Sequence, residues 1–307
     1  MPKKLIAIIA LVFVVFSVRS LDAVEGKGGQ GGAFLRIPVG ARPAGMGNAF
    51  VSISDDANAM YFNPGALYQI KGFTFGTMWS LMSMDRNHYQ GSFIYSNKRF
   101  GSFGLMIGGF QVSNIDGRDK EGKPTGEFKD SEMAFSVGYG RQLFRFLGLG
   151  ASFKYLNHSL KDKDANGLGF DLGAHSRIEI ANSSLSLIRV GISISNLGAK
   201  LKWNTDSSHE DEIPTTLRFG AGFDLTFDRV RILLALEGSQ TTDESFKFHG
   251  GIETYLYKTL GLRFGLNAED ISFGASLKYN LLQFDYAFCP DVLEEGATSK
   301  IGIQVEF

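Results

Sequence analysis

Polar and apolar side chains alternate along most of this chain, and the alternation is strictest near its C-terminal end. In the last eight residues one face of an extended strand would carry Ile301, Ile303, Val305 and Phe307, and the other face Lys300, Gln304 and Glu306. Side chains in a strand point to opposite faces with a period of two, so this pattern predicts a strand with one apolar and one polar face. The same pattern recurs in nearly every segment before it, which predicts an all-β protein.

Fourteen segments of this kind follow one another to the end of the chain. They lie at 71–82, 88–97, 100–113, 130–142, 146–158, 166–178, 187–197, 213–227, 230–240, 245–256, 259–267, 270–280, 281–289 and 298–307. Their lengths, about 9–15 residues, fit strands that cross a bilayer at a tilt of about 45°. Single-chain bacterial outer-membrane barrels also have an even number of antiparallel strands.

The apolar faces are bulky and aromatic, which decides between a soluble and a membrane barrel. Phe219, Phe223 and Phe227 share one face of the segment 213–227, and Arg218 and Asp224 share the other. A closed barrel of fourteen strands is too wide for side chains to fill from within. In a membrane barrel the apolar face meets lipid and the polar face lines the lumen. We therefore predict a closed antiparallel transmembrane β-barrel of about 14 strands.

The lengths of the connections indicate the orientation of this barrel. Odd-numbered connections, such as 113–130 and 197–213, are mostly long and polar, whereas even-numbered ones, such as 97–100 and 256–259, are short. Outer-membrane barrels place short turns on the periplasmic side and long loops outside. Two connections, at 178–187 and 267–270, do not follow this rule.

The N-terminal region is expected to be a leader followed by a non-barrel segment. Lys3 and Lys4 precede an apolar run, 5–16, and then small and polar residues, which is typical of a cleaved signal peptide over 1–23. Twelve apolar residues are too few for a membrane-spanning helix, which needs about 20. We expect the hatch or plug segment at 24–70, the barrel at 71–307, and the mature protein in the cell outer membrane.

One stretch of the N-terminal segment has a distinctive sequence. It reads GARPAGMGNAF over 40–50 and DDANAMYFNPGAL over 55–67. This stretch resembles the opening of the PorV/PorQ family, a branch of the FadL-type outer-membrane barrels, although Gly65 and Ala66 are exchanged relative to that pattern. The residues that carry the resemblance are Gly40, Arg42, Gly45, Gly47, Asp55, Asp56, Asn63, Pro64 and Gly65. The resemblance implies a fourteen-stranded barrel whose N-terminal region lies inside as a hatch.

The residues of this segment also support a local structure. Asp55 and Asp56 precede a short apolar run that stops at Pro64, which predicts one or two helical turns capped by aspartate. Such a plug either gates the lumen or only fills and stabilises it. Both interpretations are open at this point.

The polar faces of the predicted strands carry charges of both signs. Eleven residues are expected to point inward: Lys154, Asp171, Arg189, Arg218, Asp224, Glu237, Lys247, Glu253, Arg263, Lys278 and Asp285. A mixture of signs in a low-dielectric lumen favours ion pairs over a selective pore. We expect a polar network within the lumen made by Arg189, Arg218, Asp224, Glu253, Arg263, Lys278 and Asp285.

Several patterns that resemble functional sites are better explained otherwise. Gly26, Gly28 and Gly31 precede no Rossmann unit, and the calcium-like run from Asp162 lacks its final glutamate at Gly173. The five His residues are scattered, and the only cysteine, Cys289, has no partner for an intramolecular disulfide. The formal net charge is −1 and both signs of charge are spread along the chain, so the sequence shows no basic cluster that would favour nucleic-acid binding. We predict no catalytic residue, no metal site, no cofactor and no enzyme activity.

Three functions agree with these features. The first is passage or binding of hydrophobic small molecules, in a pocket near the outer mouth lined by Leu81, Met82, Met84, Leu201, Trp203 and Ile213. The second, implied by the family resemblance, is docking of exported proteins in type IX secretion, and the charged connection 113–130 slightly favours it. The third is a structural barrel without transport. Expected partners are outer-membrane lipid, secretion-system proteins or cargo, hydrophobic small molecules, and the barrel-assembly machinery, which would read the C-terminal strand that ends at Phe307.

Overall fold

The computed structural model describes residues 31–307 except 182, 206–208, 228–229, 269 and 291–296. Short helical segments come first, followed by strands. The helical segments are η1 (Ala33–Arg36), α2 (Ala41–Gly45), α3 (Ala59–Phe62) and η2 (Pro64–Gln69). The strands are β1 (Gly72–Leu81), β2 (Arg86–Asn97), β3 (Gly101–Arg118), β4 (Pro124–Phe144), β5 (Leu147–Leu160), β6 (Lys163–Glu179), β7 (Leu185–Trp203), β8 (Glu210–Glu212), β9 (Thr216–Phe227), β10 (Val230–Thr241), β11 (Lys247–Leu256), β12 (Leu260–Asn267), β13 (Asp270–Tyr279), β14 (Leu282–Pro290) and β15 (Ala297–Glu306).

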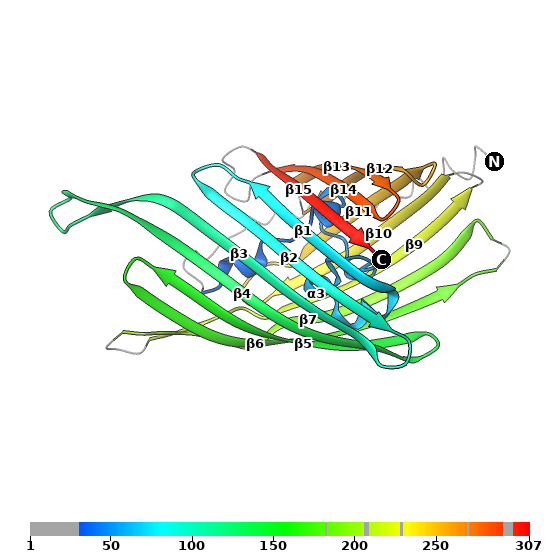
Figure 1. Cartoon of the computed structure of the whole chain (residues 1–307), viewed down its shortest axis with the longest axis horizontal. Coiled ribbons are helices and arrows are strands. Elements are labelled where there is room, and N and C mark those ends of the chain that lie inside the picture. The colour runs from blue at the N-terminus through cyan, green and yellow to red at the C-terminus, as the bar shows by residue number, and fades with distance from the viewer. Residues whose placement is uncertain (1–30, 182, 206–208, 228–229, 269, 291–296) are drawn as a thin grey trace.

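The strands close into one antiparallel barrel, seen from the side in Figure 1. Each strand pairs with its neighbours in sequence, except that β7 pairs with β9, and β8 is a three-residue strand attached to the outer part of β7. The ring closes where β1 pairs with β15, with Thr74 opposite Glu306 and Leu81 opposite Ser299. Fourteen strands therefore form the wall, as the alternation predicted. Closure leaves no unpaired edge in the wall, which a strand structure in lipid requires.

Side-chain burial shows that the barrel is apolar outside and polar inside. On β1, Trp79 is 50% exposed, whereas Thr74 is 2% exposed. The same alternation of exposed aromatic or aliphatic residues with buried polar ones continues through most of the wall. This is the arrangement of a membrane barrel. Among the described residues, no helix is both long and apolar enough to cross a membrane.

The two ends of the barrel differ, and several outer connections are shorter than the sequence predicted. Most of the expected loop 113–130 is strand, because β3 and β4 remain paired out to Gly117 and Gly126. The expected loop 158–166 is also mostly strand, and β7 continues to Trp203. These hairpins extend beyond the rest of the barrel at the left of Figure 1. The short turns, at the opposite end, include 98–100 and 280–281.

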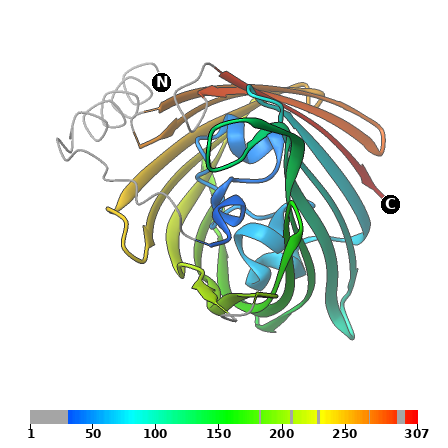
Figure 2. The same ribbon diagram turned by 90° about the vertical axis from the view of Figure 1, so that its left-hand side faces the viewer.

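The N-terminal segment from residue 31 to residue 70, called the hatch below, lies inside the ring of strands, as Figure 2 shows. Helix α3 stops at Phe62, just before Pro64, as expected. Its N-cap is Asn58, which makes no side-chain cap, so the expected aspartate cap is wrong. Asp56 instead accepts the N–H of Asn58 in the turn before the helix. The predicted signal peptide lies outside the described residues, and the division into leader, hatch and barrel stays a prediction.

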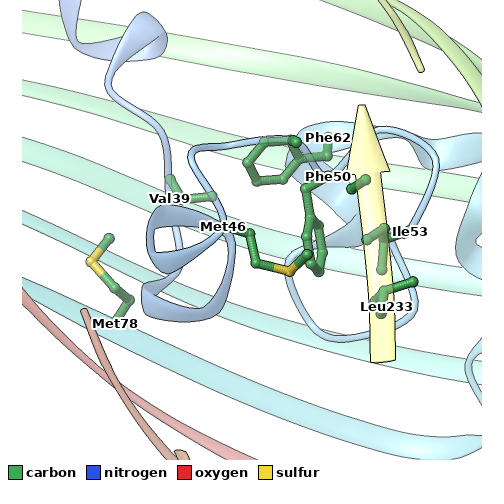
Figure 3. Packing of buried hydrophobic residues seen from close by; sticks show 9 residues of the cluster. Val39, Met46, Phe50, Ile53, Phe62, Met78 and Leu233 are labelled. Carbon is green, nitrogen blue, oxygen red and sulfur yellow. The ribbon is translucent and has the colours of Figure 1, made fainter. Parts of the chain in front are cut away.

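The hatch packs against the inner wall through a buried apolar cluster. Phe50 and Phe62 meet edge to face with ring centroids 5.3 Å apart, and Met46, Ile53 and Leu233 surround them (Figure 3). Leu233 belongs to β10, so this cluster joins the hatch to the wall. The apolar core of the molecule is therefore a contact between hatch and barrel.

Two close approaches require glycine on both sides. A Cβ at Gly47, whose φ is +62°, would lie 2.2 Å from the carbonyl oxygen of Leu266, and a Cβ at Gly265 would lie 1.9 Å from the nitrogen of Gly47. A Cβ at Gly65 would similarly lie 2.4 Å from the carbonyl oxygen of Gly173. The hatch backbone thus touches the backbone of the wall, which only residues without a side chain permit.

Candidate functional site

The side chain of Arg42 joins the hatch to the barrel wall. Its Nε and Nη2 donate to the two carboxylate oxygens of Glu253 on β11, at 2.8 and 2.7 Å. Its Nη1 donates to Asp55 at 2.7 Å and to Asp56 at 3.0 Å. The two-point contact with Glu253 uses the planar fork of the guanidinium, a geometry that lysine does not offer. Arg42 therefore binds two hatch carboxylates and one wall carboxylate at once.

From Asp55 the ion pairs continue to the next part of the wall. Arg189 on β7 donates to Asp55 at 2.8 Å and to Asp224 on β9 at 2.9 Å. Arg231 on β10 also donates to Asp224. Three neighbouring strands are thereby connected to the hatch through a single carboxylate.

From Glu253 the ion pairs continue in the other direction around the barrel. Arg263 on β12 donates to Glu253 at 2.6 Å and lies 2.9 Å from Asp285 on β14. Arg263, Glu253 and Asp285 all point into the lumen and are buried. The connected ion pairs, called the hatch network below, thus reach from β7 to β14.

The hatch network contains one more acid than bases. Its bases are Arg42, Arg189, Arg231 and Arg263, and its acids are Asp55, Asp56, Asp224, Glu253 and Asp285. Burial raises the pKa of Asp56 from 3.8 to about 6 against the attraction of Arg42, and the charge of Asp55 adds to the increase. Burial would also raise the pKa of Asp55, but Arg42 and Arg189 outweigh it and hold that pKa well below its usual range. Asp56 is therefore the hatch carboxyl most ready to take up a proton.

A second wall carboxylate fixes the hatch through its backbone. Glu237 on β10 accepts the N–H groups of Phe50 and Val51, both at 2.7 Å, through one oxygen. Its other oxygen accepts from Arg218 on β9 at 2.9 Å. This arrangement satisfies two buried backbone donors that no helix or sheet uses, at the point where the chain turns between α2 and α3.

The backbone carbonyl groups of residues 51–53, in the same turn, are bonded to polar side chains. Asn63 donates to the carbonyl oxygens of Val51 and of Ala174 in the wall, both at 3.0 Å. His175 on β6 lies 2.8 Å from the carbonyl oxygen of Ser52, and Gln69 donates to that of Ile53 at 2.8 Å. The segment 50–56 is therefore bonded to the wall on both its donor and its acceptor groups.

The structure brings together most of the candidate residues of the polar network and separates one of them. Arg189, Asp224, Glu253, Arg263 and Asp285 belong to the hatch network, and Arg218 is bonded to Glu237 beside it. Lys278 lies at the short-turn rim instead, where it is paired with Glu306 at 3.0 Å and is part-exposed. No pattern in the sequence indicated that Arg42 and Asp55 would complete this network, because their wall partners lie more than a hundred residues away.

The other hatch motif residues take backbone roles. Gly40 and Gly47 have positive φ values, of 85° and 62°. Asn63 accepts the N–H of Gly65, and Pro64 occupies the first turn of η2, where its missing N–H costs nothing. At the end of the barrel, Phe307 is 70% exposed and its backbone pairs with Phe73 on β1. A role of Phe307 in assembly stays a prediction.

The apolar residues expected to form one outer pocket are divided among different environments. Leu201 and Ile213 are buried together with Phe34 of the hatch, and Trp203 packs at the edge of this cluster. Leu81 and Met84 are more than half exposed. Met82 lines a cavity of about 50 Å³, beside Pro38 and Lys300. Sites for small organic ligands usually hold roughly 300–1,000 Å³, so this cavity is too small for one.

Four of the five scattered histidines, His158, His175, His209 and His249, have separate polar partners in the part of the chain that the structure describes. His158 is paired with Asp130 at 2.7 Å, and His249 lies between Ser239 and the carbonyl oxygen of Gly47. Within the described residues, no group of three or more His, Cys, Asp or Glu side chains is arranged to hold a metal ion.

The comparison with protein families agrees with this geometry. Residues 29–241 match the family described as "Type IX secretion system protein PorV". The chain belongs to the PorV family. No curated protein sequence matches the chain.

Solved structures show the fold of this PorV-family barrel in other proteins. The CymD monoaromatic hydrocarbon channel is 14% identical, with a TM-score of 0.56 over 88% of this chain and 98% of that one. The Pseudomonas putida toluene transporter TodX is 14% identical, with a TM-score of 0.53 over 87% and 96%. A Pseudomonas aeruginosa FadL homologue is 8% identical, with a TM-score of 0.52 over 88% and 98%. At these identities the likeness shows a shared FadL-like fold alone.

Removing the guanidinium of Arg42 should destabilise the hatch. In Arg42→Ala, Asp55 and Glu253 keep Arg189 and Arg263 as partners, whereas Asp56 loses the guanidinium that it binds. Leaving a buried charge without its partner costs on the order of 3–5 kcal/mol. We expect faster hydrogen exchange of the amides of residues 50–56, measured by mass spectrometry on the folded protein. Arg118→Ala is the control. It removes the exposed ion pair between Arg118 and Asp116, whose charged atoms lie 3.8 Å apart, and should have no effect. Unchanged protection in Arg42→Ala would contradict the role of Arg42.

The stability of the hatch should also depend on pH through Asp56. Because the folded pKa of about 6 exceeds the ordinary value of 3.8, the contribution of Asp56 is present in full at low pH and is lost as the pH rises through 6. Between about pH 4.5 and 7, wild-type protection of residues 50–56 should fall by about 2 kcal/mol relative to Asp56→Asn. Taking the difference between the two proteins cancels titration of His175, which also faces the hatch. Parallel pH profiles for the two proteins would rule out Asp56 as the titrating group.

Proposed function

We propose that this PorV-family barrel works in type IX secretion as a sealed docking protein for exported polypeptides, and not as an open channel for small molecules. The observation that carries the proposal is the hatch network, which ties the hatch to strands from β7 to β14 through buried ion pairs. A barrel closed in this way can act only through its outer and inner surfaces.

The outer hairpins supply a surface suited to a protein partner. The tip of the β3–β4 hairpin extends beyond its neighbours and carries Asp116, Arg118, Asp119, Lys120 and Glu121, all exposed. Exposed charges of both signs favour contact with another polar surface over contact with a hydrocarbon. This hairpin is therefore our candidate for the docking element.

Passage of hydrophobic molecules is the second candidate function, because CymD and TodX are described as a hydrocarbon channel and a toluene transporter. Against it, Phe34 of the hatch packs against Leu201 and Ile213, where such a molecule would have to enter. A bound hydrophobic molecule found by mass spectrometry in the purified protein would favour this second function over the first.

The sealed lumen can be tested by electrical recording. We expect no steady conductance from the wild-type protein in planar bilayers, because the hatch fills the lumen. Deleting residues 40–67 removes both Arg42 and the backbone that Glu237 binds, and should open a conducting path. The variant that lacks residues 40–67 must still fold, which is checked by the heat-modifiable gel mobility of a folded barrel. If it folds and conducts no more than wild type, the hatch does not seal the barrel.

Docking can be tested by shortening the β3–β4 hairpin. Replacing residues 114–128 by Asn-Gly keeps the last regular pair, Val112 with Asp130, and removes the charged tip. We expect the shortened protein to release several-fold less of a type IX exported protein into the medium. In the full-length hairpin, a photoreactive group placed at residue 120 should crosslink to that exported protein. The shortened protein should remain folded and non-conducting, which serves as the control. Normal secretion by that protein would exclude the hairpin as the docking element.

A further inference from the structure

The short-turn rim of strands β1–β5 carries positive charges alone. Lys71, Lys98, Arg99, Arg141 and Arg145 are all exposed there, and they are called the cationic rim below. No Asp or Glu occurs in 57–84, 86–115 or 133–161, which contain all five. Among the described residues, none of the five takes part in an ion pair, and two rim acids on the flanking strands, Glu179 on β6 and Glu306 on β15, are paired with Arg177 and Lys278.

The outer ends of the same strands are different. There Arg118 lies beside Asp116, His158 is paired with Asp130, and the segment 161–164 alternates Lys and Asp. Unmixed positive charge is therefore a property of one end of these strands and not of their exposed residues in general. The formal net charge of the whole chain is −1, a value that does not reveal this difference in charge between the two ends of β1–β5.

Exposed aromatic rings lie among the cations. Phe100, Phe144 and Phe146 are each 58–60% exposed and lie in or next to the two short turns, 98–100 and 145–146, near which four of the five cations lie. The rings of Phe144 and Phe146 are stacked with centroids 6.0 Å apart, and the guanidinium of Arg99 lies 5.4 Å from the ring centroid of Phe100. Aromatic rings at the ends of membrane strands prefer the depth of the lipid headgroups. The rings therefore place the neighbouring cations at that depth.

The chemistry of this rim fits a phosphate group attached to lipid. Guanidinium groups bind phosphate in a two-point geometry, and free cations near a membrane surface attract anionic headgroups. The apolar side chains of the same strands, among them Phe103 and Leu105, continue from the rim into the lipid-facing surface without a break. We propose that the cationic rim is a binding surface for anionic phospholipid headgroups in the leaflet that faces the short turns.

The proposal can be tested with the full-length protein in nanodiscs made from equal parts of phosphatidylglycerol and phosphatidylcholine. Lipids that stay bound after release from the disc are counted by native mass spectrometry. Wild type should retain phosphatidylglycerol in preference to phosphatidylcholine. In Arg99→Gln/Arg141→Gln/Arg145→Gln that preference should fall at least five-fold, since each cation near an anionic surface contributes roughly a five-fold factor.

The matched control is Lys120→Gln/Lys123→Gln/Lys129→Gln, which removes three cations from the outer hairpin and should leave the preference unchanged. An equal loss in both triple variants would overturn the proposal, because net charge and not the rim would then select the lipid. Absence of any preference in wild type would overturn it as well. If soluble glycerol 3-phosphate, or an acidic peptide of poly-glutamate, competes as well as the lipid does, the rim recognises phosphate or acidic protein in general, and the lipid assignment is wrong.

Discussion

The ion pairs of Arg42 are the interaction through which the hatch network joins the hatch to the wall. A membrane barrel must turn its charged side chains inward, and charges removed from water are costly unless they are paired. The wall pairs these charges among its own strands, Glu253 with Arg263 and Arg189 with Asp224. The hatch adds a second partner to each, because Arg42 also binds Glu253 and Asp55 also binds Arg189, so the same buried charges that balance within the wall hold the hatch in place.

The wall resembles proteins described as hydrocarbon channels, at identities that show fold alone. In this chain the hatch lies inside the wall (Figure 2). Here the hatch backbone comes within van der Waals distance of the wall at Gly265 and Gly173, positions where any side chain would hold it away. Glycine on the inner face thus determines how closely the hatch fits, and the ion pairs determine where it is bound.

The sequence predicted the wall far better than it predicted the site. The alternation of polar and apolar residues occurs in every strand, so each strand can be recognised separately from its own residues. Counting these segments gives fourteen. The sequence did not predict the outer extensions of the hairpins, because both faces of these strands become polar beyond the membrane. In 124–130 only Pro124 and Phe128 are apolar. The segment is nevertheless strand, and Phe128 pairs with Ile115. The contact of Arg42 with Glu253 spans 211 positions, and no local pattern records such a distance. What the motif at 40–67 did indicate, through its resemblance, was that a hatch exists.

If the lumen is sealed as we propose, the barrel acts through its two rims, and the charges of the two rims differ. At the outer end both signs alternate along the hairpins, which suits contacts that must form and release with proteins of varied sequence. At the inner end of β1–β5 the charge is of one sign and is accompanied by aromatic rings, which suits a continuous anionic surface. A protein that conducted solutes would place its selective groups in the lumen, whereas here the charged lumen groups of the hatch network bind one another in ion pairs. The distribution of unpaired charge is therefore the physical reason to look for the activity of this barrel at its edges.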